Sequence, residues 1–417
     1  MNDNPQDIDD VEMVFYAELG GVYYKRRPSR LEMWDVEDNY RVLREPKLRQ
    51  VAIRSSHLFL GIDNEGRFCY MNNPLTAIEY NDSFEDTNYK TLYDLGALDS
   101  SFTTMRCAWF LNNGNVLVFE SCNSSTGHIG GLWLIDNADN TFRKVLTFGS
   151  ADVMFLHRGN IAIHGDEIWY GEYGTWGNAK LYLSTNNGES FSLVKDFAVA
   201  DNVVPNGTHI HGIIKDVFWN RIWVATGDYA NEDGQNSKRI WWSDNGGLTW
   251  SFKNLTYIFG DSLSPYDCVQ FLTGYADKDF IIWGGDDYNN CIYRSIRNDK
   301  DVIPDRVFYY APNETNKVTQ YTGEMQKLSN GLIVVPVLNG DSGNFPQQTR
   351  LMGTFDGITW YELYAEGLQT EGRLPVANDG VLVERDGYLY YGSVTSDLAS
   401  GQVQICNLIK FMMPRVE

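Results

Sequence analysis

Acidic residues recur along the chain, and each follows a short apolar segment that is typical of a β-strand. Successive acids are 52, 56, 59 and 54 positions apart, and a tyrosine often comes next. The series consists of Glu120, Glu172, Asp228, Asp287 and Asp341, and one further step in each direction reaches Asp63 and Ser393. Carboxylates accept hydrogen bonds from hydroxyl groups and can act as general acids or bases, so the series could line a binding or catalytic site. The alternative is that each acid accepts hydrogen bonds from the N–H groups of its own loop.

Histidine and aromatic residues accompany these acids. His209 and His211 stand two apart at the start of a predicted strand, so their side chains should point to the same side. A structural role, contact with a ligand and metal binding are all open for this pair. Because a zinc site needs a third clear ligand, we predict no metal and no cofactor.

Sugars offer hydroxyl groups to carboxylates and C–H faces to aromatic rings, so we interpret the whole group as a glycan-binding site. Its predicted members are His209, His211, Glu120, Glu172, Tyr173, Asp228, Tyr229, Asp287, Tyr288 and Asp341.

The strands that must position these residues repeat with a period of about 55 residues, which is the size of one propeller blade. In the unit around residue 230, strands are expected at 209–216, 221–226, 239–242 and 250–253. The dipeptides Asn113-Gly114, Asn330-Gly331 and Asp386-Gly387 fit tight hairpins between the first and second strands of other units. We therefore predict an all-β fold, a single β-propeller of four-stranded antiparallel blades. In this fold, acids at the ends of second strands would surround the mouth of the central channel.

Seven blades are predicted, with six blades as the alternative. The C-terminal unit supplies three strands, at 381–384, 389–392 and 403–408, and the fourth is expected from residues 13–45. Pairing the two ends of the chain in one blade would close the ring and remove an exposed sheet edge. The predicted organisation is an acidic arm at 1–12 and a propeller at 13–417; with six blades, the N-terminal part would be an addition to the ring.

A second motif occurs late in several units, between the predicted third and fourth strands. The segment 243–250 is the fullest copy, 184–191 has two conservative changes, 354–360 is one residue shorter and 135–142 is degenerate. Asp and Asn tolerate a left-handed backbone and glycine permits a positive φ, so the motif predicts a structural turn on the face opposite the acids. The residues assigned to it are Ser184, Asn186, Gly188, Phe191, Ser243, Asn245, Gly247, Thr249, Trp250, Thr354, Asp356, Gly357 and Trp360.

These turns resemble the Asp-box, or BNR repeat, and the chain is similar over residues 50–410 to the sialidase-like Asp-box β-propeller superfamily. The superfamily includes sialidases, other glycoside hydrolases, and binding or assembly proteins without catalytic activity. Sialidase catalysis would imply an arginine triad, a Tyr–Glu nucleophile pair and an Asp acid/base. The arginines of this chain lie at unrelated positions within their units, at Arg106, Arg158, Arg221, Arg239 and Arg350.

Composition limits the partners. Lys+Arg 34 against Asp+Glu 55 gives a net charge of −21, which would repel a phosphate backbone, so we predict no nucleic-acid partner. No run of about 18 apolar residues is present, which predicts no membrane insertion. The six cysteines lack metal-like spacing and are interpreted as buried free thiols. The N-terminus lacks the features of a secretory signal, so the chain is expected to be made in the cytoplasm.

Two functions from different classes follow. The favoured hypothesis is a rigid binding or assembly module, directed at a glycan or at other virion or assembly proteins. An acidic chain without a secretory signal, rich in Asn and Tyr, fits a bacteriophage virion component for tail assembly or host recognition, which becomes extracellular on lysis. The alternative is a carbohydrate-active enzyme, a glycoside hydrolase or lyase, that uses two carboxylates at the channel mouth. The catalytic candidates are Glu172, Asp228 and Asp287.

Overall fold

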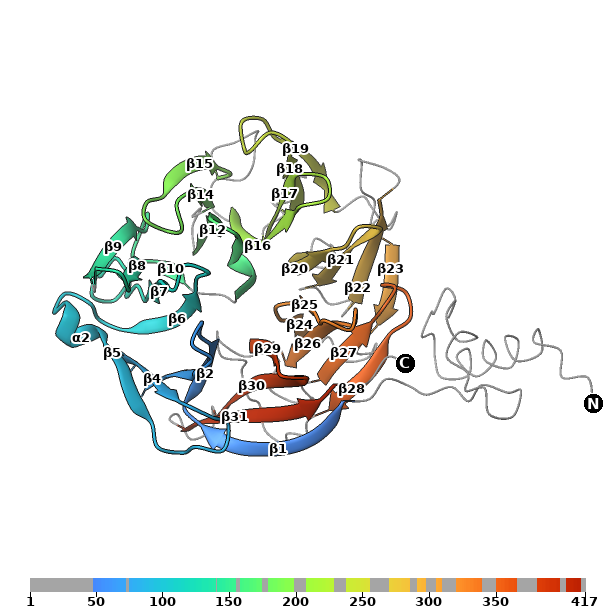
Figure 1. Ribbon diagram of the computed structural model, residues 1–417. Helices are drawn as coiled ribbons and strands as arrows, with labels where there is room; N and C mark the ends of the chain where they lie inside the picture. Colours follow the sequence, from blue (N-terminus) through green and yellow to red (C-terminus); the bar gives the residue numbers. More distant parts are fainter. Residues whose placement is uncertain are drawn as a thin grey trace, which may run out of the picture.

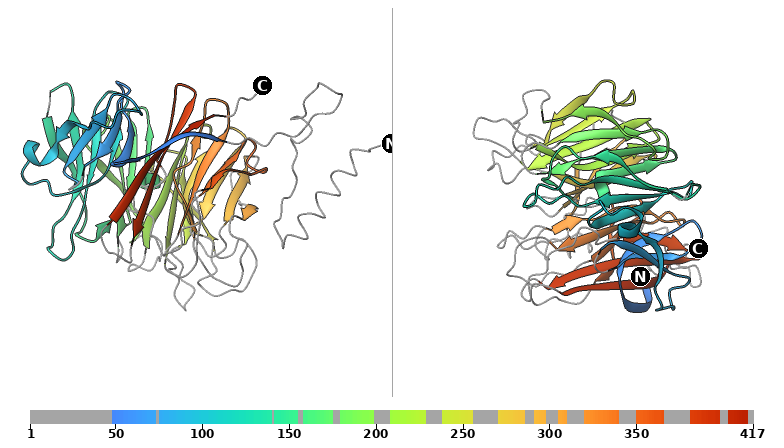
Figure 2. Two further views of the ribbon diagram at one scale, coloured as in Figure 1. Left: turned by 90° about the horizontal axis from the view of Figure 1, so that it is seen from below. Right: turned by 90° about the vertical axis from the view of Figure 1, so that its left-hand side faces the viewer.

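Seven antiparallel sheets of four strands stand around a central axis, with the first strand of each sheet nearest to the axis (Figure 1). The strands run through the thickness of the disc in the edge-on views (Figure 2). The prediction of an all-β propeller with seven blades is confirmed, and the six-bladed alternative is wrong. The structure, a computed structural model, describes residues 48–72, 75–139, 141–154, 158–174, 179–198, 208–228, 238–255, 270–285, 291–297, 305–309, 320–339, 350–365, 381–397 and 403–413.

The blades follow one another along the chain. From first to fourth strand, blade 1 consists of β2 (Leu58–Ile62), β3 (Phe68–Met71), β4 (Ala77–Asn81) and β5 (Lys90–Asp94). Blade 2 consists of β6 (Met105–Phe110), β7 (Val116–Glu120), β8 (Gly131–Asp136) and β9 (Thr141–Thr147). Blade 3 consists of β11 (Ile161–His164), β12 (Glu167–Gly171), β14 (Lys180–Ser184) and β15 (Ser192–Asp196). Blade 4 consists of β16 (Thr208–Asp216), β17 (Arg221–Asp228), β18 (Arg239–Ser243) and β19 (Ser251–Asn254).

The remaining three blades have the same strand order. Blade 5 consists of β20 (Phe271–Ala276), β21 (Phe280–Gly285), β22 (Cys291–Ile296) and β23 (Asp305–Tyr309). In blade 6 the first strand is divided into β24 (Gln320–Thr322) and β25 (Gln326–Lys327), followed by β26 (Ile333–Asn339), β27 (Arg350–Thr354) and β28 (Tyr361–Ala365). Blade 7 consists of β29 (Val381–Arg385), β30 (Tyr388–Asp397), β31 (Val403–Met412) and β1 (Arg49–Ser56).

Short elements outside the blades complete the described chain. The pair β10 (Val153–Met154) and β13 (Tyr173–Gly174) adds a two-stranded sheet beside blade 3. The short helix α2 (Leu95–Leu98) and a 3-10 turn at Arg158–Asn160 lie in connections between blades. Within the described ranges, no helix is long and apolar enough to span a membrane.

Strand β1 closes the ring, because it pairs along its length with β31 from the other end of the chain (Figure 1). The register runs from Arg49 opposite Met412 to Ser56 opposite Cys406. Closure by an N-terminal strand is therefore correct, but the strand that performs it begins at Arg49, beyond the predicted closing segment 13–45. That segment and the acidic arm at 1–12 lie outside the described residues.

The two faces of the disc differ in their connections. On the mouth face, first strands begin and second strands end; on the turn face lie the hairpins between strands one and two and between strands three and four. The predicted dipeptide turns lie on the turn face, where Gly114, Gly331 and Gly387 have φ of +89°, +88° and +78°. Only glycine adopts such a backbone conformation without a steric cost, so these turns could be identified from the sequence.

The three better copies of the turn motif connect third and fourth strands on the turn face, in blades 3, 4 and 6. In blade 4, Ser243 Oγ accepts hydrogen bonds from the N–H groups of Asn245 (3.4 Å) and Gly247 (2.9 Å). Asn245 Oδ1 accepts from Thr249 N at 2.9 Å, and Trp250 Nε1 donates to Gly247 O at 2.8 Å. The motif residues therefore bond to one another within a single turn, which is a stabilising role without a ligand.

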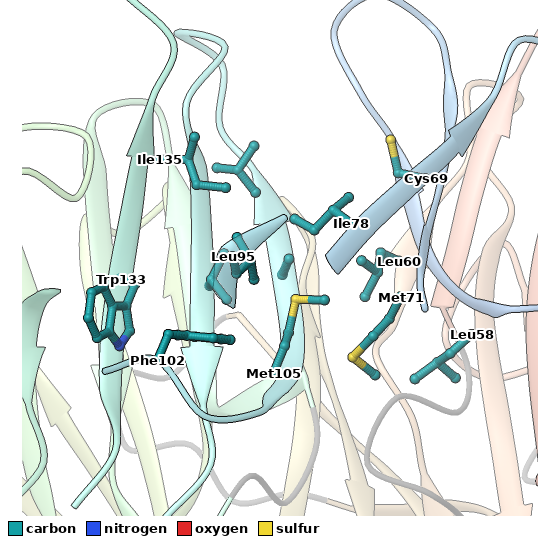
Figure 3. Close-up of a cluster of buried hydrophobic side chains, with 13 residues drawn as sticks. Leu58, Leu60, Cys69, Met71, Ile78, Leu95, Phe102, Met105, Trp133 and Ile135 are labelled. Atoms are coloured by element: carbon teal, nitrogen blue, oxygen red, sulfur yellow. The ribbon is translucent and has the colours of Figure 1, made fainter. Parts of the chain in front are cut away.

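Apolar side chains fill the space between neighbouring blades. One cluster lies between blades 1 and 2, with residues from three strands of each blade (Figure 3). Its members Cys69, Ile78, Met105 and Val118 have no exposed surface. Of the predicted free thiols, Cys69 and Cys107 are buried and Cys122 is half-buried. The side chains of Cys268, Cys291 and Cys406 lie outside the described part. The closed ring thus has a separate core at each blade contact, which makes its hub a rigid frame.

Candidate functional site

The first strands of blades 2, 4 and 5 each carry a β-bulge near the mouth face. The extra residues are Arg106, His211 and Leu272, at corresponding positions of their sheets. A bulge leaves one residue unpaired in the ladder and turns its side chain out of the regular alternation. Three blades therefore bring an additional side chain to the same level near the axis.

The first strand of blade 6 is interrupted at this level. Pro336 of β26 has no N–H group, so it cannot donate a ladder hydrogen bond to the first strand. The first strand ends as β24 at Thr322 and resumes as β25 at Gln326, and between them Gly323 N donates to Pro336 O at 2.8 Å. Glu324 lies in this interruption, lines the channel and has a side chain that is 46% exposed.

Glu324 forms an ion pair with Arg158 of blade 3 across the channel. Arg158 Nε is 2.9 Å from Glu324 Oε2, and Arg158 Nη1 donates to Cys107 Sγ and to Ala108 O, both at 3.1 Å. The guanidinium carbon also lies 5.4 Å from the ring centre of Trp109. One arginine therefore connects blades 2, 3 and 6. Sequence reasoning did not find this pair, because the partners are 166 positions apart and carry no shared motif.

The two predicted histidines form the centre of a ring cluster at the mouth face. Their imidazoles stack at 4.8 Å with an interplanar angle of 17°, so His209 and His211 lie on the same side, as predicted, although the bulge at His211 interrupts the alternation on which the prediction was based. The ring of Tyr173 lies 4.1 Å from His209 and 5.6 Å from His211. His209 Nδ1 is 3.2 Å from Gly174 O, and His211 Nδ1 is 3.1 Å from Gln270 Nε2. Both histidines are buried, whereas Tyr173 is half-buried and is thus the most exposed of the three rings.

Glu120 is engaged inside the protein. Its Oε1 accepts from Thr103 N at 3.1 Å and lies 3.2 Å from His128 Nε2. Its Oε2 accepts from Trp133 Nε1 at 2.8 Å and pairs with Lys144 Nζ at 2.9 Å. The side chain has no exposed surface. The backbone N–H that Glu120 binds belongs to the incoming connection and not to its own loop, as the loop-capping alternative would require, and the geometry leaves no carboxylate oxygen at the surface for a ligand.

Glu172 has the equivalent position in blade 3. Its Oε1 accepts from Gly149 N at 2.8 Å and from Tyr182 OH at 3.3 Å, and the residue is fully buried. Burial raises the pKa of Glu172, while the Gly149 N–H and the charge of Lys180 oppose this rise. Glu120 and Glu172 both bind a backbone N–H of the connection from the preceding blade, at Thr103 and Gly149. Each acid therefore holds the incoming chain against the end of its own second strand.

Asp228 does not share this position. In blade 4 the residue opposite the start of the third strand is Thr226, which pairs with Arg239 and accepts a hydrogen bond from Trp241 Nε1 at 3.1 Å. Asp228 follows two residues further on. Its side chain and all of the residues Tyr229, Asp287, Tyr288 and Asp341 lie outside the described part of the chain. Their ligand contacts, and the catalytic roles of Asp228 and Asp287, stay predictions.

The placement of Asp63 at the end of a second strand is wrong. Asp63 follows β2, which is the first strand of blade 1, so it lies on the turn face. Its Oδ1 accepts from Glu65 N at 3.0 Å and Arg67 N at 2.8 Å. A five-residue apolar segment fits a first or a second strand equally well, and only the pairing with β3 identifies β2 as the first. Asn72, directly after β3, occupies the end of the second strand instead.

Three of the arginines have partners of their own: Arg221 begins a second strand on the turn face, whereas Arg239 and Arg350 begin third strands on the mouth face. Arg221 Nε is 2.6 Å from Asp244 Oδ1, and its guanidinium lies among three tryptophan rings. Arg239 Nε donates to Asn254 Oδ1 at 2.9 Å, and Arg350 Nη1 is 3.5 Å from Glu362 Oε2. They begin second or third strands in blades 4 and 6, so they do not converge on one carboxylate-sized site. Among the residues that the structure describes, no three His, Cys, Asp or Glu side chains could hold a metal ion together.

Comparison with known proteins supports the fold. No protein-family model matches the chain, and no curated protein matches it in sequence. A chain of the mitotic checkpoint complex matches with a TM-score of 0.51 and 8% identity, over 89% of this chain and 94% of that one. The N-terminal domain of Nup159 matches with a TM-score of 0.50 and 9% identity, over 89% and 95%.

A GH74 enzyme from Niastella koreensis is also similar, with a TM-score of 0.48 and 15% identity over 76% of this chain. This chain spans 46% of the length of that enzyme. At these identities the likeness concerns the fold alone. The class that fold and geometry define is a closed, seven-bladed β-propeller with a ring cluster at the mouth of its channel.

Proposed function

We propose that the protein is a rigid propeller binding module that binds a glycan at the mouth face. The observation that carries the proposal is the cluster of Tyr173, His209 and His211, in which a half-buried tyrosine ring lies 4.1 Å from a buried imidazole. Aromatic rings pack on the C–H faces of sugars, and imidazole nitrogens exchange hydrogen bonds with hydroxyl groups. His209 and His211 stand on the first strand of blade 4, and Tyr173 is held in the short sheet of β10 and β13, so little ordering is required on binding, which favours affinity.

The burial of Glu120 and Glu172 favours a binding function over hydrolysis. A glycoside hydrolase needs two carboxyl groups about 5–10 Å apart on either side of the scissile bond. Glu120 and Glu172 have no exposed surface and accept hydrogen bonds from groups inside the protein. The net charge of −21 supports the further proposal that the module belongs to a virion or a comparable assembly rather than to a nucleic-acid complex.

A glycan array probed with the labelled protein tests the proposal, followed by titration of the best ligand. Tyr173→Ala should weaken binding about tenfold, because loss of a packed ring is worth about 1.4 kcal/mol. Tyr388→Ala is the matched control, since Tyr388 is also half-buried but begins β30 on the turn face. Absence of any glycan ligand, or equal binding by both variants, would contradict the proposal.

A further inference from the structure

We infer that the central channel contains a second binding site, for one neutral polyhydroxylated molecule of monosaccharide size. The site is a cavity of 220 Å³ whose wall is formed by the first strands of blades 3, 4, 5 and 6. It extends from Arg158 and Glu324 along β11 and β16 to His164 and Lys215, near the turn face. The ring cluster of Tyr173 is not part of its wall, so this site is independent of the proposed mouth site.

The polar groups of the wall form ion pairs. Arg158 is paired with Glu324 at 2.9 Å, and Lys215 Nζ is paired with Glu167 Oε1 at 2.8 Å. Arg158 and Glu324 offer donors and an acceptor to the cavity, and Lys215 offers donors, which is what sugar hydroxyls need. Glu167 itself is not part of the wall. Because each cation already has a carboxylate partner, an anion would find no uncompensated positive charge. The pairing therefore favours a neutral polyol over a phosphate or a carboxylic acid.

Apolar groups complete the wall between the ion pairs. Ile163 and Tyr275, both half-buried, provide this apolar surface. Ile161, Ile213 and Met325 border the cavity with side chains that belong to the cores between blades. A pyranose ring has the same division into a hydroxyl rim and C–H faces, so it matches a wall with polar ends and apolar sides.

The size of the cavity limits the ligand. At about 30 Å³ per molecule in the liquid, 220 Å³ is the space of roughly seven waters. This is sufficient for one sugar ring or one inositol. The small contact area predicts weak binding, with a dissociation constant on the order of 1 mM.

Calorimetric titration of the full chain with glucose, galactose and myo-inositol tests the inference, with inorganic phosphate and gluconate as anionic probes. At least one neutral probe should saturate below about 50 mM and bind more tightly than both anions. Ile163→Phe, which fills the cavity, and Lys215→Met, which removes a donor, should each weaken binding at least tenfold. Tyr173→Ala should leave it unchanged.

Each contrary result has a definite meaning. No saturation by any neutral probe, or tighter binding of phosphate, would overturn the inference. The inference would also be overturned if Lys215→Met and Ile163→Phe are folded, with the unfolding temperature of the wild type, and still bind the neutral probe as tightly as the wild type does. Loss of monosaccharide binding in Tyr173→Ala would assign the ligand to the mouth face and remove the channel site, while leaving the glycan proposal intact.

Discussion

We predict that Arg158 contributes more than Glu324 to the stability of the protein, although the two form one ion pair at the hub. Arg158 is 12% exposed and donates to Cys107 Sγ and Ala108 O as well as to Glu324. Glu324 is 46% exposed. Replacing the arginine should therefore damage the contacts of three blades, whereas replacing the glutamate should affect a half-solvated ion pair only.

The two effects differ in expected size. Arg158→Met keeps much of the side-chain volume but removes two hydrogen bonds from a charged donor, each worth about 1.5–3 kcal/mol, so we expect a loss of about 3–5 kcal/mol. Glu324→Gln should cost about 1 kcal/mol or less, because exposed ion pairs are screened by water. The coupling between the two substitutions should likewise stay below about 1 kcal/mol.

Urea unfolding followed by tryptophan fluorescence measures these values in the wild type, both single variants and the double variant. The chain has 12 tryptophans, so the signal reports on most blades. Equal losses for the two single variants, or a coupling above about 3 kcal/mol, would refute the reasoning, because either result would require the ion pair itself to be the dominant interaction.

Two further predictions concern the turn face and a buried acid. Gly247 has φ +90° and a Cβ there would meet Val194, so Gly247→Ala should lower the free energy of unfolding by about 2 kcal/mol or more. Gly246 has φ +68° but lies in open space, so Gly246→Ala should lower it by only about 1 kcal/mol in the same urea assay. Burial raises the pKa of Glu172 above its ordinary value of 4.5, so the folded chain holds this proton more tightly than the unfolded chain. The resulting stabilisation is complete below pH 4.5 and is lost as the pH rises through the raised pKa. Stability measured from pH 4 to 8 should thus decline less in Glu172→Gln than in the wild type, and an unchanged or steeper decline would argue against a raised pKa.

Much of the fold could be predicted from the sequence, because its signals lie within a few residues of one another. The strands expected in blade 4 at 209–216 and 221–226 are observed at Thr208–Asp216 and Arg221–Asp228. Gly247 and Asn245 form a turn through hydrogen bonds inside one eight-residue segment, so the motif specifies its own geometry. The repeat of these local units predicted seven blades, even though one of its assumed positions, Asp63, belongs to a first strand.

The candidate site depended on contacts that only the closed ring creates. The sequence by itself determined the blade and its turns, because periodicity and turn chemistry act over short distances, whereas the stacking of His209 and His211 also depends on the bulge. Only the tertiary structure decided that Glu120 and Glu172 are buried and hold the connections from the preceding blades. It also decided that Glu324 meets Arg158 across the axis, since that contact requires the interruption opposite Pro336 and the joining of blades far apart along the chain. Side-chain direction at a strand end depends on neighbouring strands, and no local pattern contains that information.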